Sequence, residues 1–587
     1  MFLKKDKTLS YRVLFTYEDH SLALLQQSGK SFWSRDEALA EILVAEMVEL
    51  ALPVSERLQS LYDEVTIAKD GVLSLFFRRI SSQLSQLQVL IASFKDFPYN
   101  IWSSGNNKKD QKLVRDQFNL RKMIVAVTLS GKLFGIDTAS GDIVWKHYLH
   151  NLAPFNEYGN PRILLFEQRT TAHYPLPPRC IVLGNAKNDD GKSLIYVFNP
   201  LTGKAFKDSE TDGVLVDHKI KQAMILTLTD NHFSKILLMV DPNNQVFSRN
   251  VCYLLTTKYK SLYLHTVNKD DGQLNGYALS TDARDRIIAK NIWTTRIPID
   301  NQAISLIFAK LPNEPVHSQG RVLGNRSVLY KYANPNLIAI TTESKDKDKP
   351  IVEIFLVDGV TGAIVFQTYQ KNARGPVKLV LCEHWIVFHY WNTKYRRYEM
   401  AVIELFEGQK KLNETIFSSF ITQLNTVSMQ SYVFPFDVIT MTVTRTEKAI
   451  THKDILIGLP GGEILSLPKV LLDPRRPFVL SASDREEGLI QYVPELPFPT
   501  ANVINYNQTI NGLRKIVTAP AGLESTSLVF AYGLDLFYTR VTPSKMFDVL
   551  KEDFDYTFIT IVLTAMILVS LVTAQLSSSS NLKKLWK

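Results

Sequence analysis

A short hairpin motif decides the fold of this chain, and its clearest copy is KLFGIDTASGDIVW, residues 132–145. An alternating strand ends at Asp137, a turn follows up to Gly141, and a second apolar segment ends at Trp145. Each part has a physical role. The Asp ends one strand and bonds the turn backbone, the Gly takes a positive φ, and the aromatic ring packs on the returning strand. The motif therefore predicts a tight β-hairpin.

The same motif recurs along the chain. It appears as NPLTG at 199–203, as DGVTG at 358–362, and in part as SGKSFW at 28–33. Strand-like runs of the same style lie at 455–458 and 464–467. Many short hairpins indicate stacked four-stranded blades. About 40 residues per blade gives roughly ten blades between residues 118 and 545. This all-β arrangement amounts to one β-propeller and part of a second, with an array of β-sandwiches as the alternative.

The composition is that of an ordinary globular protein. Among 587 residues, 45% are hydrophobic and 21% are charged, which excludes a disordered chain and a coiled-coil rod. The net charge of +9 is spread thinly along the chain, so it gives no argument for nucleic-acid binding. Cys180, Cys252 and Cys382 form no CxxC pair, which excludes a zinc or thioredoxin-like site. We interpret them as buried free thiols, with one long-range disulfide as the alternative.

The composition of the C-terminal segment predicts a membrane anchor. Residues 556–576, YTFITIVLTAMILVSLVTAQL, contain no charge. At about 1.5 Å per residue such a helix spans roughly 30 Å, the thickness of a bilayer core. An acidic juxtamembrane segment, 546–555, precedes it, and the tail 577–587 carries only basic charges. The positive-inside rule places this tail in the cytosol and the bulk of the chain on the lumenal side. Asp553 and Asp555 are candidates to pair with basic groups of partners, with solvated charge as the alternative.

Two further features bear on topology. N-x-S/T sequons at Asn325, Asn413 and Asn507 are the expected glycosylation sites of a lumenal domain. The first 15 residues, MFLKKDKTLSYRVLF, show no apolar stretch with a cleavage site, so no signal peptide is expected there. Either the chain is shortened at its N-terminus, or the domain is cytosolic and tail-anchored.

A helical pattern interrupts the hairpins between a remnant blade at 1–33 and a polar linker at 103–117. Residues 34–37 resemble a capping box that starts a helix through Leu50, within a helical segment at 34–102. Residues 71–97 carry apolar residues in alternating steps of three and four. We interpret this stripe as a helix along the membrane interface, with docking on protein as the alternative. The residues expected to enter the interface are Leu73, Phe76, Phe77, Ile80, Leu84, Leu87, Ile91 and Phe94.

The sequence contains none of the common enzyme motifs. The patterns GxSxG, HExxH, GxxxxGK[ST] and GxGxxG do not occur. The Gly-rich run at 458–463 lacks the Lys and the following helix of a phosphate loop, and indicates a hairpin turn. Cys382, His384 and His389 lie close in sequence, but in one strand the first two face one side and the third faces the other. We therefore expect no catalytic residue, no cofactor and no metal site.

Three long segments resemble one known family. They are HSQGRVLGNRSVLYKYANPNL at 317–337, LPGGEILSLPKVLLDPRRP at 459–477, and GLESTSLVFAYGLDLFYTRVTPSKMFDVLK at 522–551. They resemble the subunit 1 family of the endoplasmic reticulum (ER) membrane protein complex. The resemblance implies a lumenal double β-propeller with one C-terminal transmembrane helix and an amphipathic helix that braces the complex at the membrane. Full-length members carry a signal peptide and several hundred more residues at the start.

The resemblance also implies a function and its partners. The chain is expected to be a non-catalytic scaffold in a complex that inserts transmembrane helices of tail-anchored and multi-pass clients into the ER membrane. The implied partners are the other subunits, the lipid bilayer and, indirectly, client transmembrane segments. Two alternatives are a tail-anchored cytosolic propeller adaptor and a quinoprotein-like propeller enzyme. The hairpin motif resembles that of quinoproteins, but these commonly carry adjacent cysteines, and no two cysteines are adjacent here.

Overall fold

The computed structural model describes most of the chain, and all structural statements refer to this part. The described residues are 2–3, 9–53, 113–157, 160–173, 176–206, 212–230, 232–248, 262–281, 287–299, 301–311, 314–346, 348–410, 419, 426–543 and 556–586. The predicted interface helix at 71–97, Cys252, Asn413, Asp553 and Asp555 lie outside them. These predictions are therefore not tested by the structure.

Eight antiparallel sheets follow one another along the described chain, and each is a blade. The first blade consists of β6 (Ile42–Glu49), β7 (Lys122–Thr128), β8 (Lys132–Asp137) and β9 (Ile143–Tyr148). The second blade consists of β10 (Leu152–Ala153), β13 (Leu164–Arg169), β14 (Arg179–Ala186), β15 (Asp189–Phe198) and β16 (Val214–Val216). The third blade consists of β17 (Gln222–Thr229), β18 (Lys235–Val240) and β19 (Val246–Ser248), and the fourth of β20 (Tyr263–Val267), β21 (Gln273–Thr281) and β22 (Ile287–Arg296).

The other four blades complete the series. The fifth blade consists of β23 (Gln302–Ala309), β26 (Leu337–Ser344), β27 (Ile351–Asp358) and β28 (Ile364–Lys371). The sixth blade consists of β29 (Ala373–Cys382), β30 (Trp385–Asn392), β31 (Arg397–Gly408) and β32 (Thr426–Val433), with the hairpin β24 (Gly320–Val322) and β25 (Val328–Lys331) at its outer edge. The seventh blade consists of β33 (Thr440–Val443), β34 (Asp454–Gly458) and β35 (Ile464–Pro468), and the eighth of β36 (Lys515–Pro520), β37 (Ser527–Tyr532) and β38 (Leu536–Val541).

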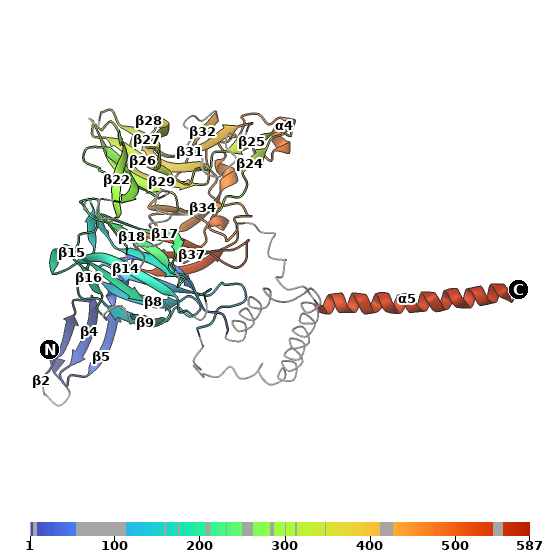
Figure 1. The fold of residues 1–587 in the computed structure, drawn as a ribbon, viewed down its shortest axis with the longest axis horizontal. Helices are drawn as coiled ribbons and strands as arrows, with labels where there is room; N and C mark the ends of the chain where they lie inside the picture. The colour runs from blue at the N-terminus through green and yellow to red at the C-terminus, as the bar shows by residue number, and fades with distance from the viewer. Residues whose placement is uncertain are drawn as a thin grey trace.

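The blades close into a ring. In Figure 1 the colours run from β8 and β9 through β26 and β31 back to β37, which lies beside the first blades. β36 of the last blade contacts β6 of the first. Two hydrogen bonds join the same blades: Tyr538 Oη donates to Leu120 O at 2.8 Å, and Gly522 N donates to Phe118 O at 2.7 Å. The predicted β-propeller is therefore confirmed, and its inner strand β6 is supplied by a segment that precedes β7 by more than 70 residues.

The hairpin motif is confirmed in atomic detail. Gly141, Gly203 and Gly362 all adopt a positive φ of 70–74°. The side chain before each turn accepts a backbone N–H two residues further on, as in Asp358 Oδ1, which accepts from Val360 N at 2.7 Å. The turn at Gly462, between β34 and β35, has the same character with φ +84°. Eight blades form within the described residues where a 40-residue period predicted ten, since residues 310–311, 314–319 and 469–514 are connections that add no blade.

The predicted helix from 34 to 50 is wrong. Only Glu37–Glu41 is helical, as a 3-10 turn (η1) whose N-cap Asp36 makes no side-chain cap bond. The residues after it form β6, which pairs with β7 along its whole length. Ala, Leu, Glu and Met in this stretch favour a helix in isolation. Pairing with β7 and burial of Ile42, Ala45 and Val48 in the ring override that preference.

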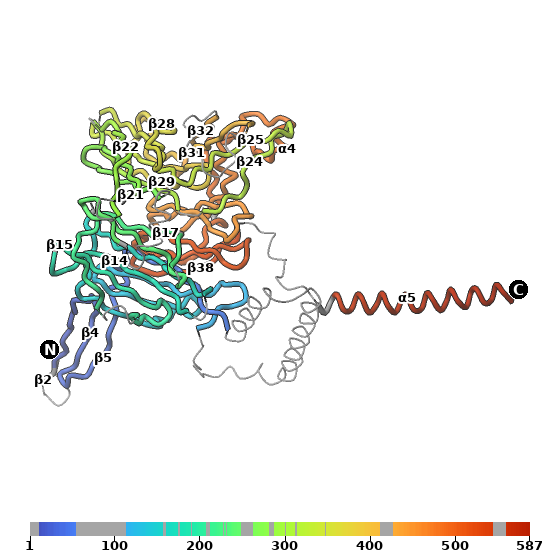
Figure 2. The backbone as a smooth tube through the Cα atoms, viewed as in Figure 1, coloured from blue at the N-terminus to red at the C-terminus, as the bar shows by residue number. Residues whose placement is uncertain are grey.

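Among the described residues, few elements lie outside the ring. β3 (Arg12–Thr16), β4 (Ser21–Gln26) and β5 (Ser31–Asp36) form a three-stranded sheet that projects from the ring (Figure 2). Its interpretation as part of a second propeller stays a prediction. The remaining short elements are β1 (Phe2–Leu3), β2 (Leu9–Ser10), β11 (Phe155–Glu157), β12 (Asn160–Arg162), η3 (Lys469–Leu472), α4 (Ala482–Glu486) and η4 (Thr500–Asn502).

The C-terminal segment is helical, as predicted. α5 (Tyr556–Leu585) is one continuous helix, and it continues past Leu576 to Leu585. Residues 559–585 are long and apolar enough to cross a membrane, and this stretch buries nothing against the rest of the described chain. A buried soluble helix would show the opposite pattern. The apolar surface of α5 is therefore available for lipid or for other helices.

Candidate functional site

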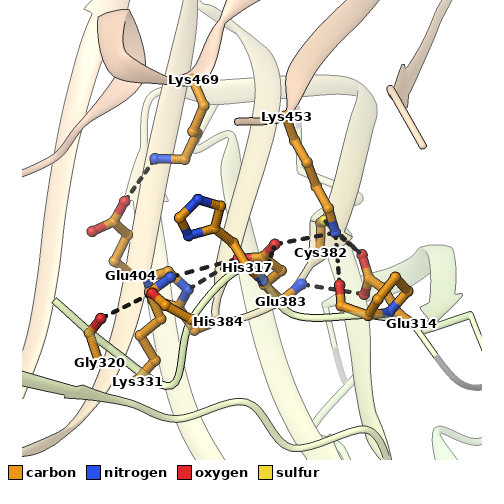
Figure 3. A network of polar contacts seen from close by, with 12 residues as sticks. Glu314, His317, Gly320, Lys331, Cys382, Glu383, His384, Glu404, Lys453 and Lys469 are labelled. Atoms are coloured by element: carbon orange, nitrogen blue, oxygen red, sulfur yellow. Dashed lines mark hydrogen bonds and ion pairs between the residues drawn. The ribbon is translucent and has the colours of Figure 1, made fainter. Parts of the chain in front are cut away.

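A polar cavity of about 450 Å³ opens between the sixth and seventh blades. It lies where β29 turns into β30, below the hairpin β24–β25 and beside the segment that follows α4. Figure 3 shows a network of polar contacts at this cavity, with Lys331, Glu383, Glu404, Lys453 and Lys469 among the labelled side chains. Residues from six separate stretches of the chain meet here, and two of those stretches, 317–331 and 469–473, belong to segments that carry the family resemblance.

One side of the cavity is an ion-pair network around Lys453. Its Nζ lies 2.9 Å from Glu314 Oε1 and 3.2 Å from Glu383 Oε1. Cys382 Sγ donates to Glu314 Oε1 at 2.7 Å. Burial alone would lower the pKa of Lys453, but Cys382 and the two carboxylates outweigh it and raise this pKa above the ordinary value. The network joins the β33–β34 loop to the β29–β30 turn and to the loop before β24.

A buried lysine supports the same wall from behind. Lys310 Nζ donates to Asn334 O at 2.7 Å and also to Glu383 O. Burial lowers the pKa of Lys310 to about 8. These bonds hold Glu383, which adopts φ +46° in the turn between β29 and β30. The turn geometry is thus fixed by side chains that come from the preceding blade.

The other side of the cavity consists of paired charges. Lys469 Nζ lies 2.6 Å from Glu404 Oε1, with its ammonium over the Trp385 ring at 5.4 Å. Arg321 Nη1 lies 2.6 Å from Asp473 Oδ2. These pairs join β31 to η3 and β24 to the end of η3, so the cavity walls are tied together by charge-assisted hydrogen bonds.

Two polar groups at the floor of the cavity are buried and unsatisfied within the described residues, and a third group, Lys331 Nζ, is held there by a long ion pair. Glu404 Oε2 and His384 Nδ1 are buried and have no hydrogen-bond partner there. Lys331 Nζ lies 3.8 Å from Glu383 Oε2, which is beyond hydrogen-bonding distance. Burial, together with nearby cations that include Lys331 and Lys469, lowers the pKa of His384 well below its ordinary value. Its ring is therefore neutral at physiological pH.

The arrangement suits binding better than covalent chemistry. Within the described part of the chain, no group of three or more His, Cys, Asp or Glu side chains is placed to hold a metal ion. Burial raises the pKa of the Cys382 thiol well above its ordinary value, and the Glu314 carboxylate adds to this shift, so a reactive thiolate is disfavoured. What remains is a cavity with fixed donors and acceptors, which is typical of a ligand or partner site.

The structure places the residues named from sequence as follows. Asn325 lies exposed in the β24–β25 turn, and Asn507 lies exposed in the loop after η4. Cys180 and Cys382 are free and buried. Cys382 ends β29 and His384 lies in the turn, so the idea that both belong to one strand face is wrong. His389 is separate on β30, where its ring stacks on Tyr398.

Sequence reasoning did not find the cavity. Lys331, Glu383, Glu404 and Lys453 carry no motif spacing, because they come from different strands that only the ring brings together. The one signal available was the resemblance of segments 317–337 and 459–477, which contribute residues to two of its walls.

A closed β-propeller that is followed by one helix able to cross a membrane defines a class, the membrane-anchored propeller proteins. Comparison with known families is more specific. The chain belongs to the family of ER membrane protein complex subunit 1, since the model described as "ER membrane protein complex subunit 1, second beta-propeller" matches residues 119–544.

Individual relatives agree with this family. The chain is 44% identical to ER membrane protein complex subunit 1 of Gallus gallus and 43% identical to that of Xenopus laevis. Each match covers 100% of this chain and 59% of the relative, so the chain spans less than two thirds of these proteins. Among solved structures, Saccharomyces cerevisiae Sqt1 matches with a TM-score of 0.31 and 9% identity over 59% of this chain and 80% of that one, too low to carry an argument.

Proposed function

We propose that this chain is a subunit of the ER membrane protein complex and works there as a non-catalytic scaffold that supports insertion of transmembrane helices. The observation that carries the proposal is the match of the propeller, residues 119–544, to subunit 1 of that complex. The clients would be tail-anchored and multi-pass proteins. The bulk of the chain would face the lumen, with the short tail after α5 in the cytosol.

The course of the chain supports a scaffold close to the membrane. β6 ends at Glu49, which pairs with Lys122, and β38 ends at Val541, which pairs with Ser527. These four residues lie at one end of the ring, which we call the exit face, because the segment 54–112 and the connection to α5 both leave there. An extended chain covers at most about 3.6 Å per residue, so the exit face lies within about 50 Å of Tyr556.

A continuous series of contacts shows that the exit face also carries the cavity. Gly522 N donates to Phe118 O, and Glu524 of the same loop accepts from Ile450 N at 3.3 Å. Three residues further along, Lys453 reaches Glu314 and the end of β29. The described chain thus leaves the ring toward α5 at the same end that carries the cavity, which supports a platform turned toward the bilayer.

α5 is suited to packing against other helices in the membrane. Thr573 Oγ1 donates to Val569 O at 2.8 Å, and Thr564 Oγ1 donates to Thr560 O, so these hydroxyls are satisfied within the helix. Small side chains of this kind permit neighbouring helices to approach closely. The proposal is that α5 packs against other subunits in the membrane and holds the propeller in a fixed position relative to them.

The test uses the tagged full chain in cells. We expect membrane retention after carbonate wash, glycosidase-sensitive Asn507 and co-purification of other subunits of the complex. Deletion of residues 556–587 should release a folded soluble protein. An unmodified Asn507 in a membrane-bound protein would favour the tail-anchored cytosolic adaptor instead. Purification of the chain without any other subunit would overturn the scaffold role.

A further inference from the structure

The floor of the exit-face cavity offers hydrogen-bonding capacity that the described chain does not use. Glu404 is 3% exposed and His384 is 6% exposed, yet Glu404 Oε2 and His384 Nδ1 have no partner within the described residues. Leaving a buried acceptor without a hydrogen-bond partner destabilises the fold. Lys331 Nζ adds a donor close to the same point. A ligand that both donates and accepts hydrogen bonds would satisfy the two buried groups and could also accept a hydrogen bond from Lys331 Nζ.

The charge of the cavity selects against an ionic ligand. Four basic and four acidic side chains line it: Arg321, Lys331, Lys453 and Lys469, with Glu383, Glu404, Asp473 and Glu487. Every cation lies within 4.0 Å of a carboxylate. A charged ligand would leave one unbalanced charge in a half-enclosed site, which is costly. A neutral polar ligand avoids this cost.

Hydroxyl groups match the spacing of the floor. Lys331 Nζ and His384 Nδ1 lie 3.8 and 4.0 Å from Glu383 Oε2, too far for direct hydrogen bonds and suited to a bridging oxygen. A hydroxyl donates through its hydrogen and accepts through its lone pairs at one atom. A ring that carries several hydroxyls could therefore bridge these gaps and still donate to Glu404 Oε2.

The walls of the cavity add apolar surface that suits the faces of a sugar ring. The rings of His317 and His452 stack at a centroid distance of 5.1 Å and an interplanar angle of 13°. Val322 and Val470 are 65% and 42% exposed at the cavity margin. A sugar ring has hydroxyl groups at its edge and C–H groups on its faces, so it complements a polar floor with flat and apolar walls.

A glycosylation sequon lies close to the cavity lining along the chain. Asn325 is the exposed tip of the β24–β25 hairpin, and β24 lines the cavity through Arg321 and Val322. The neighbouring Gly324 N donates to Glu487 Oε1 at 2.9 Å, and Glu487 also lines the cavity. The asparagine is thus next to a residue that contacts the cavity lining and lies three residues from Val322 of that lining.

We propose that the exit-face cavity is a carbohydrate-binding site for a neutral sugar ring, and that its occupant is the N-linked glycan on Asn325. The second part rests on the proposed lumenal location, and the first part does not. Docking of this glycan would fix the β24–β25 hairpin against the seventh blade and satisfy the buried Glu404 and His384.

The sugar class is tested with a free probe. The full chain with Asn325→Gln, purified in detergent, leaves the cavity open, and free Man5GlcNAc2 oligosaccharide is titrated by calorimetry and saturation-transfer NMR. We expect saturable binding, weakened about tenfold or more by an added Lys331→Gln, since a lost hydrogen bond to a charged group costs at least ~1.4 kcal/mol. Lys192→Gln, a lysine paired on the surface of the second blade, is the matched control and should change nothing.

The source of the sugar is tested on the native glycoprotein. Endoglycosidase H should release the Asn325 glycan several-fold more slowly than the exposed Asn507 glycan, and Lys331→Gln should remove the difference. Equal rates in the unmodified protein, or no glycan at Asn325 when Asn507 carries one, would overturn Asn325 as the source. Thermal unfolding of each variant confirms that it is folded.

The sugar site and the lumenal location can be refuted independently of each other. No binding of Man5GlcNAc2 to the Asn325→Gln protein, or equal binding after Lys331→Gln, would overturn the sugar site whatever the topology. Unmodified asparagines at both 325 and 507 would overturn the lumenal location, while the titration would still decide the chemistry of the cavity.

Discussion

Trp145 of the first blade packs against Gly203 of the second, and the contact leaves no room for a side chain. A Cβ on Gly203 would lie 2.5 Å from the indole, whose Nε1 donates to Pro200 O at 2.8 Å. Trp293 of the fourth blade repeats the relationship with Gly362 of the fifth, at 2.4 Å. The hairpin motif is therefore also a joint between blades: the tryptophan of one blade packs on the turn glycine of the next.

Replacing Gly203 by alanine should destabilise the propeller by about 2–4 kcal/mol, because it adds a clash with Trp145 to the strain of a side chain at positive φ. Gly141→Ala is the matched control. Its φ of +74° is almost the same, but nothing lies within 4 Å of its Cβ, so only the strain of about 1–2 kcal/mol remains. Denaturant unfolding of both variants measures the difference. Equal losses would show that the interblade contact adds nothing.

Lys453 holds the buried Glu383 and the partly buried Glu314 together, so its removal should be costly. Lys453→Met leaves Glu314 and Glu383 without their shared cation, and we expect a loss of about 3–5 kcal/mol in the free energy of unfolding. Lys192→Met removes an exposed ion pair and should have little effect. Calorimetry on both variants provides the comparison. A Lys453→Met protein as stable as its control would mean that the network does not support the seventh blade.

The local parts of the fold were predictable from sequence, and the non-local parts were not. The hairpin at Asp137–Gly141 follows from turn chemistry that acts within a few residues. β6 could not be predicted in this way, because Glu46 and Met47 favour a helix and only the partner strand β7, beyond residue 120, makes the segment a strand. The same reason hides the cavity: Lys331, Glu404 and Lys453 meet only after the ring closes.

Asp454 should make stability depend on pH. Burial raises the pKa of Asp454 to about 6, above the ordinary value of 3.8, although Ser466 Oγ donates to it at 2.9 Å. The folded state therefore binds more protons between pH 4 and 6, so its stabilising contribution is present below pH 4 and is lost as the pH rises through 6. Asp454→Asn should be more stable than the parent protein by about 3 kcal/mol at pH 7 and equal to it near pH 4. A difference that does not change with pH would contradict this assignment.

The predicted interface helix at 71–97 is tested through its apolar stripe. Phe76→Asp, Leu84→Asp and Ile91→Asp together place three carboxylates where an acyl boundary is expected, which makes insertion unfavourable. We expect the propeller to stay folded and α5 to keep the chain in the membrane, while co-purification of other subunits is lost. Gln83→Asp, Gln86→Asp and Gln88→Asp add the same charge mostly off the stripe and should leave co-purification intact. If both triple variants keep their partners, the stripe does not brace the complex; if both lose them, added charge rather than the apolar face is responsible.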